Sequence, residues 1–549
     1  MSTDNVLSPI VAKLAAVQIP PSLLKNAVVA LSGLTAIIVI GIVADYVRML
    51  RLRRTLPPGP FPLPVVGNHL QIPKSKPWIA FEKWSKHYND PLLTIWLGRR
   101  PIIVANDAWS ASEMMEKKAN IYSSRPRIVI MGDMFNATNY NQVVLTYGDR
   151  WRLHRRLMHT VVGSQAVRSW RDIQSAESKI MIRDLLDEPE DYVFHIERYA
   201  CSVVSIIGWG RRINRKNDYV AQQALAMMNN AVDVVIPGAY WMESIPELTK
   251  LPKWLYKLPS LIWEQSNLML KYFYALSLEG SKAHEKNFSA RLIDEQEASG
   301  LTNEEVATLT GNLIGGGVDT TSSTILSFIL AMCVFPEVQK KAQAEIDAVV
   351  GQDRAPVWED EDSLPYVQAI VKETLRWRTV TILGGIPHAP IKDDIFRGYH
   401  IPAGTNITGN LWAIHRHPRE FPDPDEFRPE RYVDGLQFDY PNTRGHNAFG
   451  WGRRQCSGQP LAEQGLFLTL ASMLWAYNIQ PGLDKDGKQA KLDIFAYTDG
   501  ENMRPVPFPA RYTPRSKKIE SIVRSEAAQA REQLSVFDGE TKLTIADVM

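Results

Sequence analysis

Phe449-Gly-Trp-Gly-Arg-Arg-Gln-Cys456-Ser-Gly458 is the stretch of this chain that decides its fold. It places one cysteine in a loop rich in glycine and arginine, and an apolar helical pattern follows directly. A thiolate of Cys456 would be stabilised there by backbone N–H groups and by the positive end of the following helix, so it could bind iron. Gly452 and Gly458 permit a tight turn, and Phe449 can cover the sulfur side of a flat cofactor. The structural alternative is a buried free cysteine beside a turn.

The composition is that of an ordinary globular protein. Of 549 residues, 45% are hydrophobic and 22% are charged, and the net charge is +2. Because no domain-wide basic excess is present, the chain is not expected to bind nucleic acid. The cysteines Cys201, Cys333 and Cys456 have no short spacing, so they predict neither a disulfide framework nor a zinc site. A reducing compartment fits them best.

Helical patterns dominate the body of the chain, and no linker divides it. Short strands are expected at Leu92–Leu97, Ile102–Val104, Ile382–Ile386 and His400–Ile401. The sequence therefore predicts a mainly α protein with small β-sheets and one catalytic domain at residues 61–512. Residues 513–549 are charged and alanine-rich, and a loosely packed C-terminal tail is favoured over a weak amphipathic helix.

An uncharged run near the N-terminus predicts a membrane anchor. Residues 27–44 are rich in Val, Ile, Leu and Ala and reach the lower length limit for a membrane-spanning helix. A buried core helix is the alternative, but a basic cluster follows the run, at Arg48, Arg51, Arg53 and Arg54. The positive-inside rule then puts the bulk of the chain in the cytosol. We expect residues 1–26 on the lumenal side, an anchor at 27–47, and a basic stop and proline hinge at 48–60.

A second signal is a long helix that carries glycines in its middle. Thr302-Asn-Glu-Glu305 predicts a capping box, and apolar periodicity continues to Phe335, roughly 50 Å further on. Three adjacent glycines at residues 315–317 cost roughly 3 kcal/mol relative to alanine, so a gain elsewhere should offset them. Close approach of a flat cofactor is one such gain, with Asp319 and Thr320 adding an acid and an alcohol beside it. A helix kink with a self-capping Asp–Thr pair is the alternative.

The cysteine loop resembles that of the cytochrome P450 family, whose pattern is Phe-x-x-Gly-x-Arg-x-Cys-x-Gly, and all five fixed positions match. The resemblance implies the cytochrome P450 fold and a haem b cofactor whose iron takes the thiolate of Cys456 as axial ligand. It assigns cofactor-binding roles to Phe449, Gly452, Arg454 and Gly458. The guanidinium of Arg454 is suited to a haem propionate.

The glycine-rich helix resembles the oxygen-binding helix of the same family. By that resemblance Gly316 and Gly317 lie against the cofactor, and Asp319 and Thr320 guide protons and water to bound oxygen.

Weaker motifs follow the family in the same order along the chain. Trp151-x-x-x-Arg155 is similar to its propionate-binding pair, with a basic surface helix as the alternative, and His388 is a further candidate for a propionate. The Glu-x-x-Arg pair Glu373 and Arg376 would form a buried ion-pair network with Arg431 behind the haem, as a structural element without a part in the chemistry.

These motifs predict a haem-thiolate monooxygenase of the fungal microsomal type, anchored in the endoplasmic reticulum membrane. Because no Gly-x-Gly-x-x-Gly follows a strand, a separate NADPH–cytochrome reductase should supply the electrons, and cytochrome b5 is a further candidate donor. A reductase-independent isomerase, dehydratase or peroxygenase and a non-catalytic haem protein are the alternatives. The Asp319–Thr320 pair counts against the former.

The substrate is expected to be a small, mostly apolar compound, and hydroxylation of a phenolic or other aromatic ring, or of its methyl group, is favoured. A larger polyketide or terpenoid is the alternative. The family contacts substrates through segments that correspond here to Pro126–Leu145, Val232–Leu258, Gly315–Thr320 and Thr381–His388. Apolar side chains in the first of these, such as Met131 and Phe135, would line the pocket or belong to the core.

Overall fold

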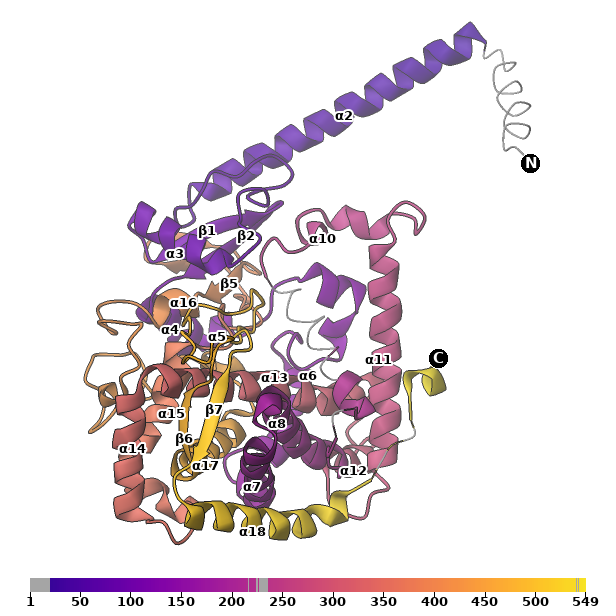
Figure 1. Cartoon of the computed structure of the whole chain (residues 1–549). Helices are drawn as coiled ribbons and strands as arrows, with labels where there is room; N and C mark the ends of the chain where they lie inside the picture. Colours follow the sequence, from indigo (N-terminus) through magenta and orange to yellow (C-terminus); the bar gives the residue numbers. More distant parts are fainter. Residues whose placement is uncertain (1–19, 216, 224–225, 227–235, 540, 542) are drawn as a thin grey trace, which may run out of the picture.

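The computed structural model describes residues 20–549 apart from 216, 224–225, 227–235, 540 and 542. A mainly helical body surrounds the long helix α13 (Asn303–Val334), while helix α2 (Pro21–Arg53) projects away from that body (Figure 1). The fold class predicted from the sequence is therefore confirmed. Residues 1–19 of the predicted lumenal segment lie outside the described residues.

The other helices follow one another along the chain, with the longest connection between α16 and α17. Their bounds are α3 (Pro77–Tyr88), α4 (Ala108–Ser112), α5 (Ala119–Tyr122), α6 (Asp149–Val162), α7 (Arg171–Asp187), α8 (Tyr192–Trp209), α10 (Trp241–Ser244), α11 (Leu258–Gly280), α12 (Phe288–Asp294), α14 (Pro336–Val349), α15 (Pro365–Trp377), α16 (Leu411–Ile414), α17 (Gln459–Ala476) and α18 (Lys517–Leu534).

Strands β1 (Leu92–Leu97) and β2 (Arg100–Ala105) pair antiparallel, and β5 (Asn406–Gly409) adds to β2 in parallel. Two-stranded sheets join β3 (Asp394–Phe396) to β4 (Tyr399–Ile401) and β6 (Tyr477–Pro481) to β7 (Ala510–Pro514). Three of the predicted strands are confirmed as β1, β2 and β4. The strand predicted at Ile382–Ile386 is wrong, because Gly384 and Gly385 adopt positive φ angles of 77° and 76° and turn the chain there.

Helix α13 begins as the sequence predicts. The hydroxyl of Thr302 accepts from the N–H of Glu305 at 3.3 Å, and the Glu305 carboxylate accepts from the N–H of Thr302 at 2.8 Å, which completes the capping box. The helix ends at Val334, one residue before the predicted end, since Phe335 caps it and Pro336 opens α14.

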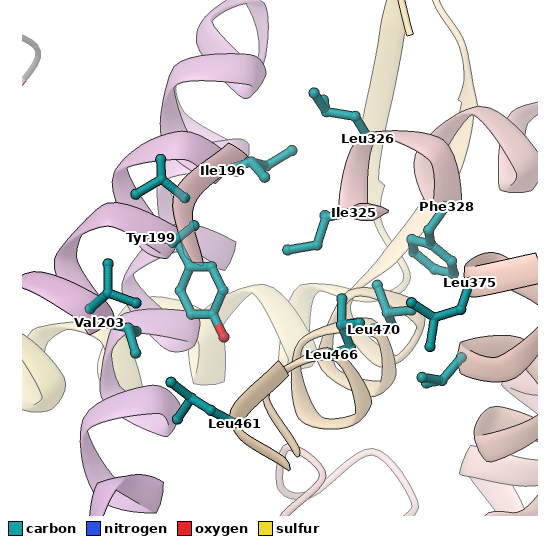
Figure 2. Close-up of a cluster of buried hydrophobic side chains, with 14 of the residues drawn as sticks. Ile196, Tyr199, Val203, Ile325, Leu326, Phe328, Leu375, Leu461, Leu466 and Leu470 are labelled. Carbon is teal, nitrogen blue, oxygen red and sulfur yellow. The ribbon is translucent and has the colours of Figure 1, made fainter. Parts of the chain in front are cut away.

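The core forms where α13 meets α8, α15 and α17. Figure 2 shows side chains from these helices gathered in one cluster, among them Ile325, Phe328 and Leu466. Each large aliphatic or aromatic side chain buried in this way contributes roughly 1.5–3 kcal/mol. The buried hydroxyl of Tyr199 on α8 is paired with Thr469 of α17 at 3.0 Å, so no polar group is stranded at that point. The cluster fixes α13 and α17, which carry the two main motifs.

The C-terminal segment is packed, so the prediction of a loose tail is wrong. Helix α18 begins with Ser516 as its N-cap and packs against α7 (Figure 1). Ile519, Val523 and Ala527 recur on its inner face and are buried, with Ala530 and Leu534 continuing the stripe. The small and aliphatic residues at helical spacing on this face are a signal of the helix in the sequence. The charged residues of its outer face favoured the interpretation as a loose tail instead.

Helix α2 fits a membrane anchor. Among the described residues, Leu24–Arg53 and Asn303–Val334 are long and apolar enough to cross a membrane, but the second is mostly buried and is a core helix. The predicted anchor 27–47 lies inside α2 and is exposed. The predicted hinge is held against the body, since Met49 and Leu56 are buried there and the N–H of Thr94 donates to the carbonyl of Pro58 at 2.9 Å.

Glu305→Gln is expected to remove a pH-dependent part of the stability. Burial raises the pKa of Glu305, but hydrogen bonds from His154, Arg150 and the N–H of Thr302 lower it to about 2 from 4.5. Because this pKa is depressed in the fold, its stabilisation is present above pH 4.5 and is lost as the pH falls through 2. We expect up to about 3 kcal/mol, less the screening by solvent at the partly exposed Arg150. Urea unfolding from about pH 6 to about pH 3 should show a shallower decline for the variant, and equal declines would contradict this role.

Candidate functional site

A cavity of about 340 Å³ lies between α6, α8, α13, α17 and the turn at residues 381–386. Most residues that the sequence assigned to the cofactor or to catalysis line it: Trp151, Arg155, Gly316, Gly317, Thr320, His388, Phe449, Arg454, Cys456 and Gly458. Asp319, Gly452, Glu373, Arg376 and Arg431 are not among its lining residues.

Cys456 lies in the loop just before α17, with its sulfur accessible from the cavity. Its N–H donates to the carbonyl of Phe449 at 2.9 Å, which closes the loop around the sulfur. Burial raises the pKa of the thiol, while the N–H groups of Gly458 and Gln459 and the charge of Arg155 act against that rise. The loop therefore presents the sulfur to the cavity with hydrogen-bond donors directed at it. A metal cation bound to the sulfur would favour the thiolate over the thiol.

Gly452 shapes the loop from outside the cavity. It has a φ of 53°, and a Cβ placed there would lie 2.2 Å from the backbone oxygen of Met115. Only glycine fits this close approach in a left-handed conformation. Its contribution is to the path of the loop, at a distance from the cavity lining.

The two predicted helix glycines serve different contacts. A Cβ on Gly316 would meet nothing within 4 Å, so this position opens onto the cavity. A Cβ on Gly317 would lie 2.6 Å from a methyl group of Val204, so this glycine lets α13 pack closely on α8. Helix packing therefore offsets part of the helix-propensity cost of Gly317.

Three guanidinium groups line one side of the cavity without a carboxylate partner among the described residues. Arg155 donates to the carbonyl of Gln455 and to the hydroxyl of Ser457, both at 2.7 Å. Arg454 donates to backbone carbonyls, including that of Ser123 at 2.7 Å, and lies 4.5 Å from the ring centre of Trp151. The third, Arg125, was missed by the sequence analysis, because no spacing relates it to the other motifs.

The positive charges of these guanidinium groups repel one another. Burial, together with the charges of Arg125 and Arg155, lowers the pKa of Arg454 to about 8. Burial also lowers the pKa of Arg125 to about 9 and that of His388 to about 3. His388 therefore stands neutral, with Nδ1 2.9 Å from the carbonyl oxygen of Tyr122. An anionic group placed among them would relieve the repulsion.

This donor set fits the haem that the cysteine loop implies. One sulfur faces the cavity from the loop. A cluster of cations without a carboxylate partner among the described residues also lines the cavity, and the two carboxylates of a haem need such partners. Cys456 would hold the iron, and Arg125, Arg155 and Arg454 would hold the acidic edge.

The carboxylate of Asp319 and the hydroxyl of Thr320, both on α13, have different surroundings. Thr320 lines the cavity, and its hydroxyl donates to the carbonyl of Gly316 at 2.6 Å. The carboxylate of Asp319 instead accepts from the side-chain amide of Asn502 at 2.8 Å and lies 3.9 Å from Arg504. Arg504 also pairs with Glu197 at 2.8 Å on α8. Asn502, Arg504 and Glu197 carried no sequence signal.

Glu373, Arg376 and Arg431 meet in the interior. Arg376 donates to both carboxylate oxygens of Glu373, at 2.7 and 2.8 Å, and Arg431 lies 3.5 Å from the same carboxylate. All three side chains are at most 2% exposed. The geometry is that of a buried ion-pair network.

The wall of the cavity beyond the cysteine side is mostly apolar. The segments expected to contact substrate supply Gln142 and Val143, Gly316 and Thr320, and the turn at 381–386. Met131 and Phe135 lie instead in a separate hydrophobic cluster, and part of Val232–Leu258 lies outside the described residues. Two further sets of lining residues were not expected from the sequence: Ala200, Val203 and Val204 on α8, and Asn312 and Leu313 on α13.

Comparison with known proteins agrees with this geometry. The family model described as Cytochrome P450 matches residues 57–499. Cytochrome P450 monooxygenase 58 of Postia placenta is 35% identical over 482 residues, which cover 85% of this chain and 90% of that protein. A cytochrome P450 monooxygenase of Armillaria gallica is 36% identical over 515 residues, covering 90% and 96%. Cytochrome P450 monooxygenase COX2 of Coprinopsis cinerea is 34% identical over 484 residues, covering 86% and 91%. The chain therefore belongs to the cytochrome P450 family of haem-thiolate monooxygenases and is similar to its fungal members.

Proposed function

We propose that this monooxygenase hydroxylates a small, mostly apolar aromatic compound, of the phenolic type, in a fungal biosynthetic pathway. The observation that carries this proposal is the shape and chemistry of the cavity beside Cys456. Its lining includes Ala200, Val203, Val204, Leu313 and Ile386, so an apolar ligand would be favoured there. Polar side chains also line the cavity, among them Gln142, Asn312 and Thr381, and they would fix the orientation of the ligand.

The bound haem supplies oxygen activation, in which one oxygen atom of O₂ enters a C–H bond and the other leaves as water with two protons and two electrons. The chain's own part is to position the substrate and to deliver the protons. The hydroxyl of Thr320 lies at the cavity and can pass a proton inward when it leaves the carbonyl of Gly316. Asp319 lies one residue away, in contact with Asn502 and near the partly exposed Arg504, so it can take protons from the solvent side.

The electrons would come from a separate NADPH–cytochrome reductase on the same membrane, with cytochrome b5 as a further donor. Arg152, Arg156 and Arg453 are exposed near the cysteine side and suit an acidic partner. Arg150, which is close to Arg152 in sequence, is engaged with Glu305 instead. A reductase-independent isomerase would not need the Asp319–Thr320 pair.

A ligand panel is the direct test of the substrate proposal. The purified haem protein is titrated with small phenols, cresols, benzyl alcohols and aryl acids, and the spin-state shift of the iron is recorded. We expect a shift with a subset of these ligands, followed by reductase-dependent formation of an oxygenated product. A normal thiolate-type spectrum with no response to any ligand would contradict the small-aromatic substrate and favour a larger polyketide or terpenoid.

We propose further that α2 spans the endoplasmic reticulum membrane once and leaves the catalytic domain in the cytosol. The exposed apolar residues of α2, the basic cluster after them and the exposed Trp254 and Trp263 of the body support this placement. A glycosylation acceptor inserted before residue 20 is expected to be modified, whereas one inserted after residue 538 is expected to remain unmodified. The reverse pattern would contradict the orientation.

A further inference from the structure

Asn312 is the polar side chain that α13 presents to the cavity one turn before Gly316. It lies next to Leu313, which belongs to the apolar wall. Its side-chain nitrogen is 3.1 Å from the side-chain oxygen of Asn141. Asn312 is partly buried, and no described residue donates a hydrogen bond to its side-chain oxygen.

The orientation of the Asn312 amide follows from its neighbour. The side-chain oxygen of Asn141 also accepts from the backbone N–H of Val143, at 3.1 Å. Because an N–H must face an acceptor, the atom of Asn141 that both groups approach is oxygen. The Asn312 group facing it must then be the NH₂, which leaves the Oδ1 of Asn312 as an acceptor without a partner in the part of the chain that the structure describes.

Asn141 is itself held firmly. Its N–H donates to the carbonyl of Ala137 at 2.8 Å, and its own carbonyl accepts from Val144 and Leu145 at 3.1 and 2.8 Å. The Asn312 amide is therefore pre-positioned by a rigid loop, and its orientation does not have to be fixed at the moment of ligand binding.

A second polar group on the wall, Thr381, leads to the same ligand chemistry. Its hydroxyl hydrogen is directed to the side-chain oxygen of Asn502, at 3.3 Å, so its lone pairs remain available to a ligand. Asn312 and Thr381 thus both offer acceptors. A carboxylate would be repelled by such acceptors, whereas a neutral hydroxyl would donate to one of them.

We propose that Asn312 is a specificity-determining residue that accepts a hydrogen bond from a neutral hydroxyl group of the substrate. The substrate class is then a phenol or alcohol with an apolar body, and aryl acids are poor ligands. This inference rests on the proposed function and names the polar handle by which the substrate is held. The hydroxyl at Asn312 orients the apolar body toward the cysteine side of the cavity.

The experiment compares ligand pairs in which a methyl group replaces the hydrogen of the donor hydroxyl. Dissociation constants are measured from the spin-state shift for 4-methylphenol and 4-methylanisole, and for the larger pair 1-naphthol and 1-methoxynaphthalene. In the wild-type protein the hydroxyl member of a pair is expected to bind about 3- to 10-fold more tightly, the range of a single neutral hydrogen bond. Asn312→Leu is expected to bring that ratio close to one, and Asn312→Ala serves as a second variant if the first folds poorly.

Val203→Ala is the matched control, because it changes the apolar wall on α8 without touching a hydrogen bond. It should weaken both members of a pair alike and leave their ratio unchanged. Discrimination by the larger pair alone would exclude a single-ring substrate but support Asn312. A wild-type ratio near one in both pairs, or a ratio that survives in both Asn312 variants, would overturn the role of Asn312.

Discussion

Cys456→Ser is expected to abolish reductase-driven hydroxylation while the chain still folds. Thiolate ligation is what favours cleavage of the O–O bond, and a serine hydroxyl does not ionise near neutral pH to replace it. The backbone bond from residue 456 to the carbonyl of Phe449 needs no sulfur and should persist. We expect turnover to fall by at least about 100-fold, the scale of a single large electrostatic contribution to catalysis. The thiolate-type carbon monoxide spectrum should disappear at the same time.

The matched control for this prediction is Cys201→Ala. Cys201 is also a free cysteine, but it is 2% exposed, lies on α8 and does not line the cavity. Its removal should cost about 1 kcal/mol of stability, as an average buried substitution does, and leave the spectrum unchanged. A Cys456→Ser protein that retains the thiolate-type spectrum would show that another residue ligates the iron.

Local patterns allowed most of the fold to be predicted. The start of α13 depends on four neighbouring residues, Thr302 to Glu305, and the structure contains the predicted capping box. The strand at Leu92–Leu97 was predicted with its observed ends, because β-branched and aromatic residues are concentrated there. The strand at Ile382–Ile386 failed because its composition resembles a strand, whereas Gly384 and Gly385 permit a turn.

Contacts between distant segments could not be predicted in this way. Arg125 donates to the carbonyl of Pro387, and Asn502 donates to Asp319, over 262 and 183 positions of sequence. No periodicity relates such residues, and only the packed body brings them together. The orientation of Asn312 likewise depends on Asn141, which lies in a loop 171 positions earlier in the sequence. The cysteine loop could be recognised because its chemistry is contained in ten consecutive residues.

The network behind the cysteine loop illustrates how strongly a contact's environment sets its energy. Arg376 donates to both oxygens of Glu373 and also to the carbonyls of His415 and Pro424, at 2.9 and 3.0 Å. It therefore ties α15 to the segment that leads into the cysteine loop. Without the guanidinium, the carboxylate of Glu373 would stay buried with the N–H of Arg428 and the more distant Arg431 as its remaining partners.

Arg376→Ala is accordingly expected to destabilise the protein by about 3–5 kcal/mol, the cost of leaving one member of a buried ion pair behind. Haem should also be lost more readily, because the segment leading to Cys456 loses its attachment to α15. Lys340→Ala provides the control, since Lys340 pairs with Glu337 at 2.9 Å with the same i, i+3 spacing, but both side chains are more than two-thirds exposed. That variant should change the free energy of unfolding by less than about 1 kcal/mol, as surface pairs do. Urea unfolding of both variants would measure the contrast, and a Lys340→Ala effect equal to that of Arg376→Ala would refute the stabilising role of the buried network.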